Sequence, residues 1–393
     1  MSIAEAAHLY DAITEADLRD VGSVKWTRFP GTIGMFIAEM DFGVAPAIAQ
    51  AVGDAMTSGF TGYLPKPTSE ALQQATARWY AEHYGWDVPA GDVRLVSDVI
   101  VAYEFAITAY TSPGAAVIVP TPAYMPFLDV PLRLGRRVIE VPSIEIDGRW
   151  TMDLDAVAKA FDEGGELLVL CNPHNPLGTV ATRDELLAIE KTVSDAGGHV
   201  FSDEIHAPLV YAPAAHIPYA TVSDAAAGHT ITATSASKAW NLAGFKCAQL
   251  ILSNDDSRAA WDADGGWAGH GTATIGVIAQ LAAYTGGEEW LNGVTEYLDG
   301  NRRELAALVA EHLPGVRVTV PEGTYIALLD FRETGLTGDL GEWFREHAGV
   351  AMTDGAACGQ AAVGYTRFVF ATPRPIMREA ILRIAKALEN RAA

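Results

Sequence analysis

Cysteine is scarce in this sequence, because the 393 residues contain only Cys171, Cys247 and Cys358, far apart along the chain. None belongs to a C-x-x-C pair, so the spacing excludes a zinc ribbon and a thioredoxin-type redox centre. An odd number of cysteines does not suit a disulfide framework either. We interpret the three residues as free thiols in a reducing cytosol.

Positive charge and long apolar runs are also scarce. The chain has 27 Lys and Arg residues against 49 Asp and Glu residues, a net charge of −22. This balance argues against nucleic acids and anionic membranes as partners, since both attract basic patches. No apolar run has the roughly 20 residues of a membrane-spanning helix. The N-terminal segment carries acidic residues instead of the apolar core of a signal peptide. We therefore expect a soluble, cytoplasmic protein.

Two common catalytic motifs are missing. The sequence contains no G-x-S-x-G elbow of a serine hydrolase and no H-E-x-x-H zinc motif. Four histidines fall within one region, but they have neither helical i, i+4 spacing nor cysteine partners at zinc spacing. We expect no metal site from these histidines, which are His174, His199, His206 and His216.

The sequence does contain a regular alternation of short β-rich runs and helical patterns over residues 48–288, which is typical of βαβ units. Several runs are continuously apolar, as expected for strands that helices cover on both faces. The pattern predicts an α/β fold with a large, doubly wound, mostly parallel sheet. The expected strands are 93–96, 115–119, 137–141, 166–171, 199–204, 230–235 and 248–253.

The rest of the chain has a different pattern. A β-rich stretch at 316–331, a helix near 338–347, a strand within 366–373 and a final helix at 375–390 indicate a smaller α+β unit. The N-terminal forty-odd residues have no strong pattern, and we expect them to pack against this unit. The predicted domains are therefore a large domain of residues 48–288 and a small domain of residues 1–47 and 289–393.

Polar motifs follow three of the expected strands, and in open α/β sheets the ligand lies beyond the carboxyl ends of the strands. The motifs are CNPHNPLG at 171–178, SDEIH at 202–206 and SASKAWNLAGFK at 235–246. Each alone has a structural explanation, such as a tight turn, a helix cap or a solvated lysine. Their occurrence together, in this order and at strand ends, favours a functional site.

With these motifs the sequence resembles the pyridoxal-phosphate (PLP) enzymes of fold type I, in the class I/II aminotransferase family, from about Lys25 to the C-terminal helix. The resemblance implies that Lys238 carries PLP as a Schiff base and takes the Cα proton of the substrate. Asp203 would pair with the pyridine N–H and Asn175 would donate to O3′. Tyr124, in PTPAYMPF, would stack on the ring. His206 would lie near O3′, and a purely structural histidine is the alternative for that position.

The phosphate group and the substrate carboxylate need further donors. The turn VSDVIVA at 96–102 leads from a strand into a helix, so the amides of Val99 and Ile100 are candidates for the phosphate. By resemblance, Arg367 would hold the α-carboxylate of a small amino-acid substrate with a bidentate fork. Tyr63 would reach the phosphate of a neighbouring subunit, which implies a homodimer with shared sites. The remaining candidates for the phosphate are Ser235, Ser237 and Lys246.

Within the family, the sequence is most similar to the MalY/PatB group of cystathionine β-lyases, or C–S lyases. The similarity lies in SVKW (23–26), FIAEMDF (36–42), GTYIALLDF (323–331) and EEWLNGVTEYLDGNRREL (288–305). It implies cleavage of cystathionine or related S-substituted cysteines to pyruvate, ammonia and a thiol. The chain departs from the group's pattern at Glu39, Asp98, Lys246, Cys358 and Val369.

Two alternatives remain open at this stage. An aminotransferase acting on an amino acid and an oxo acid would use the same residues, because the two reactions differ in where the substrate is reprotonated and in whether Cβ carries a leaving group. A non-catalytic PLP-binding regulator is the second alternative. The presence of Lys238, Asp203, Asn175 and Arg367 and the lack of a basic DNA-binding segment argue against it.

Overall fold

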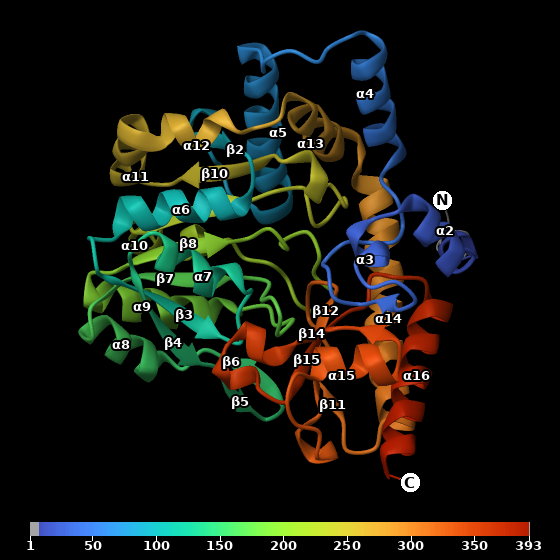
Figure 1. Ribbon diagram of the computed structural model, residues 1–393. Helices are drawn as coiled ribbons and strands as arrows, with labels where there is room; N and C mark the ends of the chain where they lie inside the picture. The colour runs from blue at the N-terminus through green and yellow to red at the C-terminus, as the bar shows by residue number, and fades with distance from the viewer. Residues whose placement is uncertain (1–7, 393) are drawn as a thin grey trace.

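The computed structural model of the protein, which describes residues 8–392, has two lobes (Figure 1). A sheet of seven strands, in the order β2–β10–β9–β8–β7–β3–β4, forms the centre of the larger lobe. β10 is antiparallel to β2 and β9, and the other neighbours are parallel. The predicted mostly parallel sheet is thus confirmed. Its strands are β2 (Val93–Val96), β3 (Ala116–Thr121), β4 (Arg137–Pro142), β7 (Gly165–Cys171), β8 (His199–Asp203), β9 (Thr230–Thr234) and β10 (Ala248–Leu252).

Helices bury both faces of the sheet at β3, which explains why the residues Ala116–Val119 of this strand are all apolar. Val117 and Val119 of β3 belong to one buried cluster with α6 and α7, whereas Ile118 between them belongs to another cluster with α8 and α9. Successive strand residues point to opposite faces, so a strand covered on both sides has no polar positions. The covering helices are α6 (Val99–Tyr110), α7 (Pro126–Arg133), α8 (Leu154–Asp162), α9 (Arg183–Ala196) and α10 (Asp224–Gly228).

The ends of α9 show how local sequence fixes an element. Thr182 and Glu185 form the predicted capping box, in which each side chain accepts from the other residue's backbone N–H. Gly197 ends the helix with a φ of 63°, a left-handed conformation that glycine adopts without strain. The expected helix start and stop are both confirmed.

The smaller lobe contains a four-stranded sheet in the order β11–β12–β15–β14. The β-rich stretch 316–331 forms two strands, and the segment between them contains Pro321, which has no N–H for a strand ladder. The elements of this lobe are β11 (Arg317–Val318), β12 (Ile326–Asp330), β13 (Val350–Ala351), β14 (Thr353–Asp354), β15 (Tyr365–Val369), α14 (Glu288–His312), α15 (Leu340–His347) and α16 (Arg374–Ala392).

The N-terminal segment joins the smaller lobe, as expected. β1 (Ile33–Gly34) pairs in parallel with β13, and the blue helices α2 and α3 lie beside the orange and red C-terminal elements in Figure 1. The exact domain boundaries stay a prediction. The other elements are α2 (Glu15–Val21), α3 (Val24–Thr27), α4 (Pro46–Thr57), α5 (Lys66–Tyr84), α11 (Asp255–Ala260), the π-helical turn η4 (Trp261–Gly265), α12 (Gly266–His270), α13 (Thr274–Gly286) and the hairpin β5 (Ile144–Ile146) and β6 (Arg149–Thr151).

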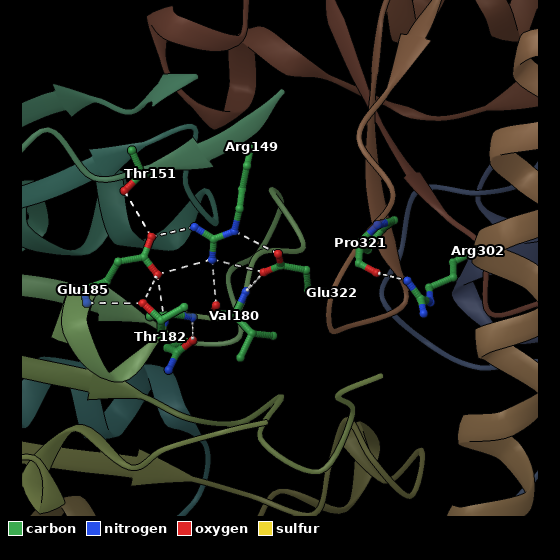
Figure 2. Close-up of polar contacts among 10 residues, drawn as sticks. Arg149, Thr151, Val180, Thr182, Glu185, Arg302, Pro321 and Glu322 are labelled. Carbon is green, nitrogen blue, oxygen red and sulfur yellow. Dashed lines mark hydrogen bonds and ion pairs between the residues drawn. The ribbon is translucent and has the colours of Figure 1, made fainter. Parts of the chain in front are cut away.

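A polar cluster fastens the two lobes together. Figure 2 shows Arg149 of the β5–β6 hairpin between two carboxylates, Glu185 at the start of α9 and Glu322 just before β12. The guanidinium lies 2.5 Å from Glu185 Oε1 and 2.8 Å from Glu322 Oε1. Val180 N donates to Glu322 Oε2 at 2.8 Å. The chain entering β12 is therefore tied to the β5–β6 hairpin and to the segment between β7 and α9. Within residues 8–392, no helix is long and apolar enough to cross a membrane.

Candidate active site

The polar motifs of the sequence meet at the carboxyl ends of three neighbouring parallel strands. Cys171 at the end of β7 pairs with Asp203 at the end of β8, and Asp203 pairs with Ala233 near the end of β9. The turn that follows β7 carries Asn175, and the loop that follows β9 carries Lys238. The site thus lies where the strand order and the rule for open α/β sheets place it.

Lys238 brings a side-chain amine into this site. Its Nζ donates to the carbonyl oxygen of Ala38 at 3.0 Å. Burial, and after it the positive charge of Arg367, lower the pKa of Lys238 to about 8, while Glu39 and Asp203 oppose the shift. A lysine with such a pKa has a substantial neutral fraction near neutral pH, so it can act as a nucleophile or a base.

Asp203 is a buried acid with spare acceptor capacity. Burial raises its pKa to about 7; the Ile205 N–H bonded to its Oδ1 at 3.0 Å lowers the pKa, Glu204 raises it and Lys238 lowers it. Its Oδ2 lies 4.0 Å from the thiol of Cys171. A buried carboxylate with a single backbone donor and a weak thiol contact has room for a strong N–H donor. The protonated ring nitrogen of PLP is such a donor.

Arg367 reaches the site from β15 of the smaller lobe. Its Nη2 donates to Phe36 O at 2.6 Å and its Nη1 to Asn175 Oδ1 at 3.4 Å, while its buried Nε has no partner. No carboxylate of the described residues forms an ion pair with it. Burial lowers the pKa of Arg367. A buried guanidinium without an acid partner is costly, and a ligand carboxylate would compensate it.

Tyr124 and His206 face the same charges. Burial raises the pKa of Tyr124, with Arg367 opposing and Asp203 adding to the shift. Burial and the positive charges of Lys238 and Arg367 lower the pKa of His206 to about 3, so its imidazole is neutral. His206 Nδ1 is buried without a partner. Buried polar atoms without partners are rare in native proteins, so His206 Nδ1 and Arg367 Nε are each available to a polar ligand.

The start of α6 explains the unexpected acid at position 98. Asp98 is the N-cap of α6 and accepts from Val101 N at 2.9 Å. Its second oxygen lies 2.9 Å from Lys246 Nζ, so Lys246 is paired with this acid. The amides of Val99 and Ile100 occupy the first two helical positions, which have no acceptor within a helix. They remain candidates for an anion.

The other predicted phosphate contacts differ in exposure. Ser235 is buried, and its hydroxyl lies 2.7 Å from that of Ser237 and donates to Cys247 O at 2.8 Å. Tyr63, between α4 and α5, is 97% exposed. The exposure of Tyr63 does not test its predicted role toward a second subunit. The roles of these residues stay predictions.

Backbone carbonyls of the segment 36–42 complete the site, and sequence reasoning did not find them. Ala38 O accepts from both Lys238 Nζ and the Tyr325 hydroxyl, each at 3.0 Å, and Phe36 O accepts from Arg367. The stretches FIAEMDF and GTYIALLDF indicate the resemblance to the family, but they do not predict these contacts, because every residue has a carbonyl group.

The family model for aminotransferase class I and II matches residues 31–384. The chain belongs to this family. It is 38% identical over 376 residues to the cystathionine beta-lyase of Corynebacterium glutamicum, covering 95% of this chain and 98% of that protein. It is 30% identical to the cystathionine beta-lyase PatB of Bacillus subtilis, covering 93% and 96% of the two chains. The PLP-bound C–S lyase of Staphylococcus hominis superposes with a TM-score of 0.89 at 27% identity, over 96% of this chain and 98% of that one. The family predicted from the sequence is confirmed.

Proposed function

We propose that this protein is a PLP-dependent carbon–sulfur β-lyase that cleaves cystathionine or related S-substituted cysteines to pyruvate, ammonia and a thiol. The observation that carries the proposal is that three side chains meet in one site: Lys238 after β9, Asp203 at the end of β8 and Arg367 of β15. Among the described residues, Arg367 has no carboxylate partner. The names of the C. glutamicum and B. subtilis relatives support the same reaction.

The residues present suit PLP. Asp203 would hold the ring nitrogen, Asn175 the phenolic oxygen and Tyr124 a ring face, with the amides at the start of α6 and Ser237 for the phosphate. His206 and Arg367 also have buried nitrogen atoms that lack partners, and the charge of Arg367 lowers the pKa of His206. When bound, PLP supplies an electron sink for the negative charge left at the substrate Cα.

Arg367 and Lys238 then act on different parts of the substrate. Arg367 binds the α-carboxylate through two parallel hydrogen bonds and so fixes the orientation of the Cα–H bond. The neutral Nζ of Lys238 accepts the Cα proton, and its lowered pKa makes the neutral amine available. The Cβ–S bond breaks with its electron pair going to sulfur, which takes up the proton that Lys238 accepted, and the thiol leaves. Water then hydrolyses the remaining three-carbon unit to pyruvate and ammonia.

We further infer a cytoplasmic homodimer with shared active sites, in which Tyr63 of one subunit serves the phosphate site of the other. The 97% exposure of Tyr63 supports this inference. The three cysteines are free and buried, which suits a reducing compartment. Residues 48–288 would form the large domain, with 1–47 and 289–393 as the small one.

The test is an assay of the purified PLP-loaded protein with L-cystathionine, in which free thiol and pyruvate are followed together. We expect equal release of both without any added oxo acid. Bound cofactor with neither product would contradict the lyase and favour an aminotransferase, which a panel of amino donors and oxo acids then detects. Loss of cofactor binding as well would contradict the whole assignment.

A further inference from the structure

A second carboxylate lies directly behind Asp203. Glu204 is fully buried, and its N–H donates to Ala233 O at 2.8 Å, so the chain is still held against β9 at this point. Successive residues of an extended chain point to opposite sides. Asp203 therefore belongs to the site, whereas Glu204 points into the protein behind it.

The Glu204 carboxylate accepts four hydrogen bonds. Oε1 accepts from the Ser202 hydroxyl at 3.0 Å and from Tyr219 N at 3.1 Å. Oε2 accepts from the Tyr80 hydroxyl at 3.3 Å and lies 3.2 Å from His216 Nε2. Two donors on each oxygen suit an ionised carboxylate, because a protonated acid would have to give up one of these acceptor positions.

His216 does not cancel this charge. Its Nε2 faces Glu204, while its buried Nδ1 has no partner. A charged imidazolium would leave the Nδ1–H buried without an acceptor, so we assign the neutral tautomer with the proton on Nε2. The other titratable groups around Glu204 are Tyr80 and Tyr84, whose pKa values burial and Glu204 raise. Among the described residues, no lysine or arginine pairs with Glu204. The cluster keeps a net negative charge.

We propose that Glu204 is a positioning residue that acts through Asp203: its buried negative charge strengthens the grip of Asp203 on the protonated ring nitrogen of the cofactor. This inference rests on the proposed function. A negative charge on the adjacent residue makes the protonated ring more favourable next to Asp203 than it would be beside an isolated carboxylate. The bond from Ser202 and the bond from Ile205 N to Asp203 also fix both acids to the end of β8.

The test separates the effect of the Glu204 charge from the effect of the shape of its side chain. Glu204→Gln keeps the size of the side chain and removes the charge, whereas Tyr80→Phe removes one donor and keeps the charge. The apoprotein of each variant is titrated with PLP and with the carbocyclic analogue in which CH replaces the ring nitrogen. Quenching of the protein fluorescence reports binding of either compound, independently of turnover.

We expect E204Q to bind PLP about tenfold more weakly, the equivalent of one pKa unit, and to bind the analogue as the unchanged protein does. Y80F should keep the ratio of the two affinities within about twofold. Glu204→Asp, which retains the charge, should restore the ratio. Because the ratio compares two ligands on one variant, it distinguishes this role from the proposed lyase reaction, which the thiol and pyruvate assay tests by itself.

Two results would overturn the role of Glu204. An equal loss of affinity for PLP and for the analogue would mean that Glu204 only supports the fold, and an unchanged ratio in E204Q would mean that its charge does not reach the ring nitrogen. If E204Q fails to fold, His216→Lys neutralises the carboxylate without removing it, and the same tenfold change in the ratio is expected.

Discussion

Lys25 and Lys238 both donate hydrogen bonds to the segment 36–42, but they differ in their charged partners. Lys25 Nζ lies 2.7 Å from Asp41 Oδ2 and also donates to the carbonyls of Glu39 and Ala371. Among the described residues, the printed hydrogen-bond partner of Lys238 Nζ is the carbonyl of Ala38 at 3.0 Å. A lysine with a carboxylate partner suits a structural role, whereas a lysine whose pKa burial lowers suits the proposed reactive role.

The same short segment serves both lysines. Asp41 also accepts from Trp26 Nε1 at 2.9 Å, so one carboxylate secures two side chains of α3. At the other end, the carbonyl oxygens of Ala38 and Phe36 accept hydrogen bonds from Lys238 and Arg367, respectively. The segment is thus anchored at the Lys25 end and presents acceptors to the site at the Lys238 end. Variants at each end test this division.

The largest effect is expected at the reactive lysine. Lys238→Ala should lower kcat for thiol release by more than about 10⁴-fold, because the variant loses both the base and the point of covalent attachment. The visible absorbance of the lysine-bound cofactor should disappear. The free energy of unfolding of the apoprotein, measured in urea, should not fall, since a poorly compensated buried charge is removed. Persistent turnover would contradict the role of Lys238.

The structural lysine should show the reverse pattern. Lys25→Met leaves Asp41 buried without its cation, and breaking a buried pair costs about 3–5 kcal/mol of stability. Urea denaturation of the apoprotein measures this loss. The double variant Lys25→Met, Asp41→Asn is the matched control, because asparagine still accepts from Trp26 and carries no charge. It should recover part of the loss; a single variant as stable as the unchanged protein would refute the anchoring role.

The pH dependence of stability tests the lowered pKa of Lys238 without an activity assay. The folded pKa of Lys238, about 8, lies below its unfolded value of 10.5. Between these pH values the unfolded chain binds more protons, so the free energy of unfolding rises with pH. We expect the apoprotein to gain up to about 3 kcal/mol over this window relative to Lys238→Met. A flat difference between the two proteins would show that Lys238 is not perturbed.

The sequence predicts the parts of this arrangement that depend on residue type and strand order. Asp203, Asn175 and Lys238 follow strands whose apolar pattern is plain, so their meeting at one sheet edge could be anticipated. Asp98 departs from the pattern of the MalY/PatB group, but an Asp directly before a helix is a common N-cap signal, so its capping role could be predicted from the sequence.

Other contacts could not be predicted because they depend on the path of the chain. The carbonyl of Ala38 meets Lys238 only after the N-terminal segment has packed against the smaller lobe. Tyr80 reaches Glu204 from α5, a helix distant in sequence. Any residue provides a carbonyl, and many tyrosines are buried without such a bond, so neither contact leaves a local pattern. Tertiary structure alone brings these groups together.

The smallest effect is expected from the second donor to Ala38. Tyr325→Phe removes the hydroxyl bond to the Ala38 carbonyl, which still accepts from Lys238, so no buried acceptor is left unpaired. The loss of stability should be about 1 kcal/mol, the net value of one hydrogen bond, and kcat should fall by less than about tenfold. Urea denaturation and the thiol assay measure the two effects. A loss of stability as large as that of Lys25→Met would mean that the contacts of Ala38 stabilise the fold as much as the Lys25–Asp41 pair does. The two lysines would then differ only in whether a carboxylate pairs with them.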